Sequence, residues 1–327
     1  MKDLNFKKKP RYEEIQDEIQ ALPGMKSIKQ QVENLVSQAI VNKARKAAGL
    51  ETDPFSNHMV LVGSPGTGKT TVTKKLGELM FELGLVSNSE VVQLSRKDLV
   101  GEFVNTAAKT TNEIITENRG KVIFIDEAYT LFSGPGDREG RQVVDELMRL
   151  AEEYRGDTAI VLAGYEKEMD GLLDANPGLK SRFSNRMVLP DYTPDEKVRV
   201  LDYIVASANR EFADRRAHKQ AQMHVASMKT TGDSGNARAV RNFYDALREA
   251  HARRIAADPR GVDAKALQTF TSSDVAAAAA KMNLPQVVKV RPPAKPKAPP
   301  EASRKAYTRR RRTGGPVVEK PGMALVR

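Results

Sequence analysis

Eight consecutive residues constrain the fold of this 327-residue chain more than any other feature of its sequence. They run from Gly63 to Thr70 and read Gly-Ser-Pro-Gly-Thr-Gly-Lys-Thr, which is a GxxxxGKT pattern. In this pattern the glycines let the backbone curl so that several N–H groups point at one anion. The lysine reaches the β- and γ-phosphates, and the last hydroxyl holds Mg²⁺. The segment therefore predicts a binding loop for a nucleoside triphosphate.

The residues on either side of this phosphate loop fit a strand–loop–helix unit. Residues 58–62 are typical of a short buried strand, and residues 71–83 read as the helix that follows. The N-terminus of that helix adds its dipole to the phosphate site. We therefore expect the nucleotide to contact residues of the loop and one residue of the next motif, namely Gly63, Pro65, Gly66, Thr67, Gly68, Lys69, Thr70 and Asp126.

A second motif, Val122–Glu127, indicates what happens to the nucleotide. Four apolar residues in a row are typical of a parallel strand buried on both faces, and ligands bind at the carboxyl ends of such strands. Asp126 lies at that end, where it can hold Mg²⁺ together with Thr70. Glu127 can polarise a water molecule for in-line attack on the γ-phosphate. Because a simple kinase activates a substrate hydroxyl and needs no such pair, the motif favours hydrolysis.

Alternating strand and helix patterns predict an α/β fold with a parallel, doubly wound sheet. The expected strands are 58–62, 90–94, 121–126, 158–163 and 186–189. Helical patterns then dominate, at 195–213, 218–228, 235–256 and 271–282, and predict a smaller all-helical domain. We therefore divide the chain into a leader (1–22), a nucleotide-binding α/β domain (23–192), a helical domain (193–284) and a tail (285–327).

The net charge of +11 is concentrated in the tail. Residues 285–327 hold twelve lysines or arginines and two glutamates, so they supply all but one unit of the net charge. The tail is also rich in proline, and such a segment buries too little apolar surface to offset its ordering entropy. We expect it to be disordered. The remainder of the chain is nearly neutral and gives no support for a basic nucleic-acid groove.

The amino-acid composition indicates the cellular compartment in which the protein works. The chain has no cysteine, which excludes disulfides and thiolate zinc sites and suits a reducing cytosol. No apolar run approaches the roughly 20 residues that span a bilayer, and the basic N-terminus lacks the apolar core of a signal peptide. We therefore expect a cytoplasmic protein with no membrane partner.

Taken together, the motifs resemble those of the AAA+ ATPases. The shared set is the phosphate loop, the strand that ends in Asp-Glu, Ser181-Arg182-Phe183, and Gly235-Asn236-Ala237-Arg238. Within this superfamily the chain resembles the branch of CbbX-type Rubisco activases, stage V sporulation protein K and the ATPase components of type VII secretion. The segments that carry this closer resemblance are Leu99–Val104, Phe124–Tyr129, Leu162–Tyr165, Asn176–Leu179 and Pro190–Thr193.

The resemblance implies a ring, usually a hexamer of identical subunits, that converts ATP hydrolysis into mechanical work on another macromolecule. It implies that Arg182 is an arginine finger inserted into the neighbouring subunit's site. Arg238 would be sensor 2, which reaches the γ-phosphate from a helical lid. Tyr165 falls at the sensor 1 position, where either its hydroxyl positions water or its ring simply packs.

The resemblance also implies a pore loop for gripping a threaded polypeptide. Phe103 and Val104 fall at its aromatic and aliphatic positions, and Asn105 stands where the family pattern has glycine. Asparagine tolerates a left-handed backbone better than most residues, so the substitution is compatible with the loop.

The sequence leaves three functions open. The first is a motor that remodels a protein substrate, which the CbbX-like motifs and Phe103 favour. The second is a nucleic-acid-handling motor, in which the basic tail supplies phosphate affinity. The third is a nucleotide-gated scaffold that assembles with ATP and translocates nothing. The identity of the substrate is not encoded in these motifs, because they belong to the ATPase engine.

Overall fold

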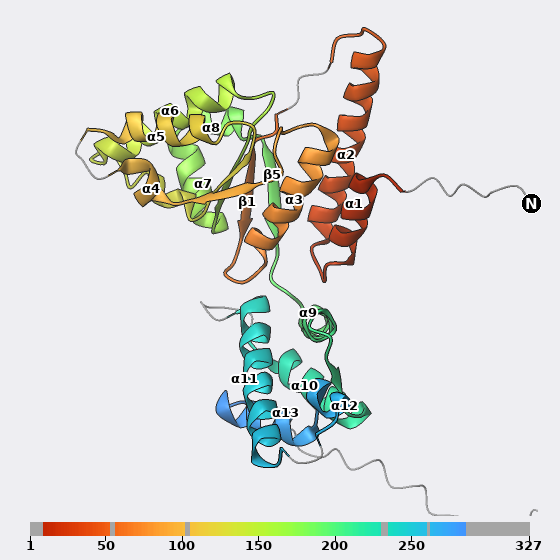
Figure 1. Ribbon diagram of the computed structural model, residues 1–327. Coiled ribbons are helices and arrows are strands. Elements are labelled where there is room, and N and C mark those ends of the chain that lie inside the picture. Colours follow the sequence, from red (N-terminus) through yellow and green to blue (C-terminus); the bar gives the residue numbers. More distant parts are fainter. Residues whose placement is uncertain (1–8, 53–55, 102–104, 230–234, 260–261, 286–327) are drawn as a thin grey trace, which may run out of the picture. The chain divides into compact units, whose positions relative to one another are not determined.

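The computed structural model describes residues 9–52, 56–101, 105–229, 235–259 and 262–285 (Figure 1). The predicted pore-loop residues Phe103 and Val104 and almost all of the basic tail lie outside the described residues.

The centre of the α/β domain is a sheet of five parallel strands. The strands are β1 (Met59–Gly63), β2 (Val91–Leu94), β3 (Val122–Ile125), β4 (Ala159–Gly164) and β5 (Asn185–Leu189). Their order in the sheet is β2-β3-β4-β1-β5, and every neighbouring pair is parallel. The predicted doubly wound parallel sheet is therefore confirmed, and each strand lies within one or two residues of its expected range.

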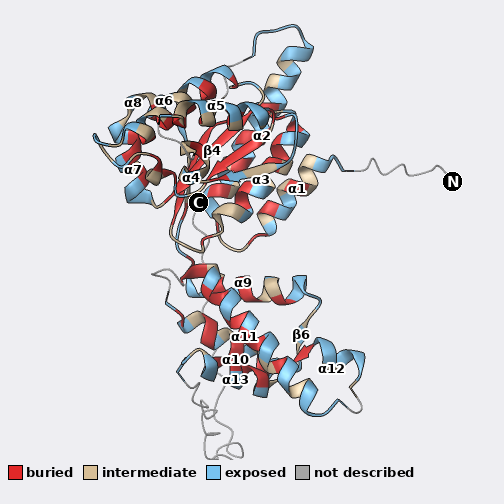
Figure 2. Ribbon diagram, turned by 60° about the vertical axis from the view of Figure 1, so that its left-hand side comes forward, coloured by how far each residue is buried: buried red, intermediate tan, exposed pale blue. Residues whose placement is uncertain are grey.

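Helices cover both faces of this sheet, which explains why its three inner strands, β1, β3 and β4, are apolar and buried at every position. Along β1, Met59 and Leu61 join the core on one face, whereas Val60 and Val62 join the core on the other. Figure 2 shows the buried positions running along the strands and the helix sides that face them. The first face packs against α1 (Arg11–Ala21), α2 (Lys26–Ala47) and α3 (Lys69–Leu83). The second face packs against α4 (Arg96–Val100), α5 (Ala107–Glu117), the 3₁₀ turn η1 (Ala128–Leu131), α6 (Arg138–Glu153), α7 (Glu166–Ala175) and α8 (Pro177–Arg182).

The helical domain begins after Thr193, which caps its first helix. The Thr193 side chain accepts from the backbone N–H of Glu196, and the Glu196 side chain accepts from the backbone N–H of Thr193. Its helices are α9 (Pro194–Ser207), α10 (Arg215–Ser227), α11 (Asn236–Ala257), α12 (Ala264–Gln268) and α13 (Ser272–Lys281). Phe243, Leu247 and Phe270 are completely buried in its core. Among the helices that the structure describes, none is both long enough and apolar enough to cross a membrane.

The helical domain also contains a short sheet that the sequence analysis did not predict. The helix expected over 195–213 ends at Ser207, because Asn209 turns the chain with a left-handed backbone (φ +50°). Residues Glu211–Phe212 (β6) then pair in parallel with Thr269–Phe270 (β7). This pairing places the rings of Phe212 and Phe270 5.9 Å apart, so the ladder is stabilised by a contact between segments far apart in sequence.

Candidate nucleotide-binding site

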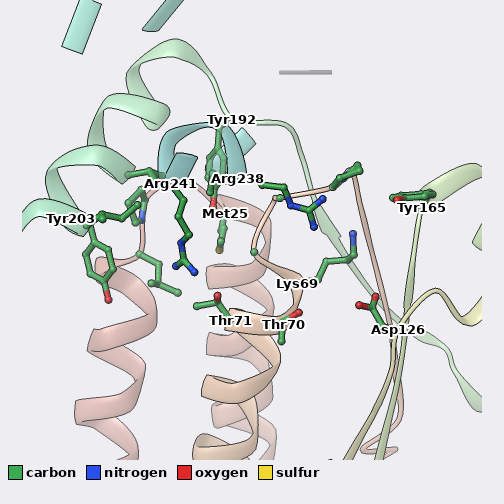
Figure 3. A pocket seen from close by; sticks show the side chains of 18 of the residues that line it. Met25, Lys69, Thr70, Thr71, Asp126, Tyr165, Tyr192, Tyr203, Arg238 and Arg241 are labelled. Carbon is green, nitrogen blue, oxygen red and sulfur yellow. The ribbon is translucent and has the colours of Figure 1, made fainter. Parts of the chain in front are cut away.

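A cavity of about 330 Å³ lies at the carboxyl ends of the strands, beside the phosphate loop (Figure 3). The loop between β1 and α3 forms one wall, the ends of β3 and β4 form another, and the start of α11 forms a third. The cavity brings together nine residues for which the sequence analysis predicted a nucleotide or catalytic role: Pro65, Gly66, Gly68, Lys69, Thr70, Asp126, Glu127, Tyr165 and Arg238.

Glycine is required in the phosphate loop for two different reasons. Gly66 and Gly68 have left-handed backbones, with φ of +74° and +97°. Gly63 is instead required by close approach, since a Cβ there would lie 2.5 Å from the carbonyl oxygen of Leu189. The Thr67 hydroxyl donates to the carbonyl of Ser64 at 2.8 Å and stabilises the turn from within. Gly63 and Thr67 therefore shape the loop, although neither is among the described residues that line the cavity.

Lys69 bends back onto its own loop. Its Nζ donates to the carbonyls of Gly63 at 2.7 Å and Ser64 at 3.2 Å, and lies 5.4 Å from the centre of the Tyr165 ring. Burial lowers the pKa of the Lys69 ammonium; the carboxylate of Asp126 opposes this shift and the guanidinium of Arg238 adds to it. Figure 3 shows Lys69 and Arg238 pointing toward the same space. Two converging cations of this kind suit a polyphosphate.

Asp126 and Glu127 stand at the end of β3 with different environments. Asp126 is partly buried, and its Oδ1 accepts from the backbone N–H of Glu127 at 3.0 Å. Glu127 is exposed and has a left-handed backbone (φ +50°), which is uncommon for a residue that is not glycine. The Glu127 carbonyl accepts from both the amide (2.8 Å) and the hydroxyl (2.7 Å) of Thr130, and these bonds maintain the turn. Glu127 is among the residues that line the cavity.

Tyr165, directly after β4, stacks on Tyr129 of η1. The rings of Tyr129 and Tyr165 lie 5.6 Å apart with an interplanar angle of 28°. Burial raises the pKa of the Tyr129 phenol to about 12, and the Glu127 carboxylate adds to the shift. Tyr165 therefore both packs against Tyr129 and lines the cavity beside Lys69. This geometry is compatible with both roles considered for the sensor 1 position, packing of the ring and positioning of water by the hydroxyl.

The arginines divide into two groups. Arg238 lines the cavity, as does Arg241 one turn further along α11. Arg182 is not among the described residues that line it. At the end of α8, Arg182 lies 3.5 Å from the carboxylate of Glu152 and donates to the carbonyl of Gly178 at 3.4 Å. Arg186 forms ion pairs with Asp170 and Glu166.

Sequence reasoning missed the apolar wall of the cavity. It is formed by residues that precede α2, follow β5 or lie on α9, namely Leu22, Pro23, Met25, Tyr192, Val200, Tyr203 and Ile204. Within this wall, Met25 adopts a left-handed backbone (φ +60°) and contacts the phosphate loop next to Gly68. The Tyr192 phenol donates to the Thr67 carbonyl at 3.1 Å, and burial raises its pKa.

A hydrogen-bond network connects the segment after Glu127 to Arg96, which lies two residues beyond the end of β2. Arg96 donates to both carboxylate oxygens of Asp137, at 2.6 and 2.8 Å, and to the carbonyls of Thr130 and Leu131. Asp137 also caps α6 by accepting from the amide of Gly140 at 2.9 Å. The adjacent Arg96 guanidinium holds the pKa of Asp137 well below its usual range. This network maintains the turn that carries Glu127.

Residues 59–191 match the family model described as "ATPase family associated with various cellular activities (AAA)", and residues 193–284 match "AAA lid domain". The plasmid-encoded protein CbxX of Cupriavidus necator is 36% identical over 266 residues, which cover 78% of this chain and 81% of that protein. The chloroplastic ribulose bisphosphate carboxylase/oxygenase activase of Cyanidioschyzon merolae is 32% identical, with 77% and 86% covered. Stage V sporulation protein K of Bacillus subtilis is 33% identical, with 74% and 76% covered.

Among solved structures, the FIGL-1 AAA domain in complex with ADP superimposes on this chain with a TM-score of 0.53. The match covers 88% of this chain and 87% of that one at 17% sequence identity, and so shows a common fold.

The Arg96–Asp137 pair predicts a loss of stability on acidification. Because the folded-state pKa of Asp137 is lowered, its contribution is complete above the unfolded pKa of about 3.9 and disappears as the pH falls toward the folded value. Asp137→Asn, which retains a capping oxygen, should lower the free energy of unfolding at pH 7 by about 2 kcal/mol. It should also flatten the acid limb of stability against pH, measured by urea denaturation.

Asp174→Asn is the control, because Asp174 pairs with Lys180 at 3.0 Å and both side chains are more than two-thirds exposed. That substitution should change stability by less than about 0.5 kcal/mol. Equal effects of the two substitutions would contradict the role assigned to the Arg96–Asp137 pair.

Proposed function

The chain belongs to the AAA ATPase family, in the branch of the CbbX proteins and stage V sporulation protein K, and it hydrolyses ATP; we propose that it uses this hydrolysis to remodel a protein substrate. The hydrolysis is supported by the convergence of Lys69, Asp126, Glu127 and Arg238 on one cavity with an apolar wall, and the protein substrate by the relatives. The division into a leader (1–22), an α/β domain (23–192), a lid (193–284) and a tail (285–327) is part of the same proposal.

The polar wall of the cavity would bind the phosphates. Lys69 would exchange its two loop carbonyls for the β- and γ-phosphate oxygens, and Arg238 would approach the γ-phosphate from α11. The apolar wall around Met25, Tyr192 and Tyr203 would hold the base.

The donors on the polar wall fit Mg²⁺, which prefers oxygen ligands and takes most of them from phosphate and water. Thr70 offers a hydroxyl and Asp126 a carboxylate, and both line the cavity. Mg²⁺ would neutralise charge on the phosphates when bound. Glu127, exposed at the cavity edge, would accept the proton of the attacking water.

The active assembly would be a ring of identical subunits, with a hexamer as the proposed size. Arg182 supports this proposal because it does not line the cavity of its own chain, as a residue that acts on a neighbour requires. Its pairing with Glu152 would be exchanged for the neighbour's γ-phosphate.

A protein substrate is proposed from the relatives, one of which is named as an activase of another enzyme, ribulose bisphosphate carboxylase/oxygenase. Phe103 and Val104 remain the proposed pore-loop residues. The second candidate, a nucleic-acid-handling motor, is favoured by the charge of the tail, which holds twelve basic residues and two acidic ones.

Substitutions of Lys69 and Glu127 separate nucleotide binding from hydrolysis. Lys69→Ala should abolish ATP binding, whereas Glu127→Gln should bind ATP and hydrolyse it about 10²–10⁴-fold more slowly, because one water-activating group is lost. Isothermal titration and phosphate release measure the two effects. Glu117→Gln, an exposed substitution on α5, should keep wild-type values. Near wild-type turnover in Glu127→Gln would show that another group activates the water.

A mixing experiment tests the ring. Arg182→Ala should bind ATP normally and lose roughly 10³–10⁵-fold in turnover. Adding Lys69→Ala subunits should restore activity, because a mixed interface can pair an intact cavity with an intact Arg182.

The control for the ring is Glu152→Gln, which removes the in-chain partner of Arg182 and should leave turnover near wild type. The specific activity of the wild-type protein should fall on dilution. A constant specific activity at all concentrations would rule out catalysis shared between subunits.

Stimulation of turnover distinguishes the two substrate classes. A protein substrate, presented as an unfolded chain or captured with the ATP-loaded Glu127→Gln form, should raise the turnover of the wild-type protein. DNA or RNA should not stimulate turnover beyond a weak effect that disappears steeply with added salt and on deletion of residues 285–327. Strong stimulation by nucleic acid alone would favour the second candidate.

A further inference from the structure

Asn236, the first residue of α11, is completely buried and is not among the described residues that line the cavity. Its side-chain amide donates to the carbonyl of Pro65 at 3.2 Å and to the carboxylate of Asp191 at 2.8 Å. Its side-chain oxygen accepts from the backbone N–H of Tyr192 at 2.9 Å. One carboxamide thus joins the phosphate loop, the connector after β5 and the first turn of α11.

Two neighbouring groups bind the next two carbonyls of the phosphate loop. The backbone N–H of Ala237 donates to Gly66 at 3.0 Å, and the Tyr192 hydroxyl donates to Thr67 at 3.1 Å. Three consecutive loop carbonyls, those of Pro65, Gly66 and Thr67, therefore accept hydrogen bonds from residues of α11 and the connector. We call the Asn236 side chain, the Ala237 amide and the Tyr192 hydroxyl the loop clamp.

The packing at this contact leaves no room for a side chain on Gly66. A Cβ on Gly66 would lie 2.6 Å from the carbonyl oxygen of Gly235 and 3.0 Å from the Cβ of Arg238. The loop and the start of α11 therefore meet backbone to backbone, and displacement of either changes the other.

The clamped carbonyls belong to the peptide units that matter for phosphate binding. The peptide unit that contains the carbonyl of Pro65, Gly66 or Thr67 also contains the N–H of the following residue. Those N–H groups lie in the segment that cradles phosphates in loops of this type. A hydrogen bond to the carbonyl fixes the orientation of the unit and polarises its N–H. The loop clamp thus orients the N–H donors of the phosphate site by binding the carbonyls of the same peptide units.

We propose that Asn236 is a positioning residue for ATP binding, through which the phosphate-binding shape of the loop and the docking of α11 stabilise each other. The inference rests on the nucleotide site proposed above. By linkage, docking of α11 raises nucleotide affinity, and bound nucleotide holds α11 in place to the same extent. Docking also sets the position of Arg238, which follows Asn236 by two residues and lines the cavity.

The chemistry explains why asparagine serves at this position. The backbone of Asn236 is left-handed (φ +55°), a conformation that glycine and asparagine adopt most easily. Its side chain uses both amide hydrogens and the oxygen. Aspartate keeps the acceptor, but it would place a carboxylate against the Asp191 carboxylate and the Pro65 carbonyl.

The test uses the full chain with Asn236→Gly, which removes the clamp side chain and leaves the left-handed backbone unstrained. The dissociation constants of ADP and of the non-hydrolysable analogue adenylyl imidodiphosphate should rise on the order of tenfold, and more in Asn236→Asp. The KM for ATP should rise in parallel, while kcat at saturating ATP stays within about threefold, because bound nucleotide restores the docked state. A loss of stability alone would not produce this split.

Hydrogen exchange supplies a second readout. The Ala237 amide does not bond to the Asn236 side chain, so faster exchange of this amide in Asn236→Gly reports undocking of α11. Its protection should return as ADP is added, with a midpoint at the dissociation constant of the variant. Asn209→Gly is the matched control, because Asn209 is also an asparagine with positive φ, but it lies at the end of α9. That control should bind nucleotide as the wild type does.

Three outcomes test the proposed role of Asn236. Wild-type affinity and KM in Asn236→Gly would overturn the inference. If Lys69→Ala also bound nucleotide normally, the nucleotide site itself would be misplaced, which is a separate failure. If Asn236→Gly does not fold, Tyr192→Phe decides, since it deletes only the hydroxyl that bonds Thr67. It should weaken ADP binding and speed exchange of the Ala237 amide, and no change in either would refute the clamp.

Discussion

The parallel pairing of five strands, of which the inner three are apolar and fully buried, is the constraint on which the rest of the structure depends. Because every strand runs in the same direction, their carboxyl ends meet at one edge, and the segments that follow β1, β3 and β4 are placed side by side. Lys69, Asp126 and Tyr165 reach one cavity for this reason alone, although almost a hundred residues separate the first from the last. Helices on both faces bury the inner strands β1, β3 and β4 at every position.

The polar half of the site was predictable because each of its residues belongs to a local pattern. The glycines, Lys69 and Thr70 lie within eight positions, and Asp126 and Glu127 directly follow an apolar strand, so spacing and residue type together indicated their chemistry. The strands were predictable for the same reason, since burial on both faces leaves continuous apolar runs. The roles of Arg182, Arg238 and Tyr165 came from resemblance and stay predictions.

The apolar half of the site and the loop clamp were not predictable, because they depend on contacts over long separations. Met25 meets Gly68, and Asn236 bonds Pro65, 171 positions away in the sequence. In the sequence, Asn236 is one polar residue in a motif known for its arginine, and Pro23-Gly24 reads only as the end of a helix. The β6–β7 ladder was not predicted for a similar reason. Strands of two residues show no periodicity in the sequence, and this pair depends on the contact between Phe212 and Phe270.

The folded-back Lys69 has a consequence for the turnover cycle. In the described state the ammonium already has two acceptors, the carbonyls of Gly63 and Ser64. If Lys69 binds the phosphates as proposed, arrival of a nucleotide replaces one set of bonds with another, and only the difference between them contributes to affinity. The same exchange runs backwards when ADP leaves, because the lysine has internal acceptors waiting and no buried charge is left unpaired. The two loop carbonyls would therefore lower the cost of releasing ADP.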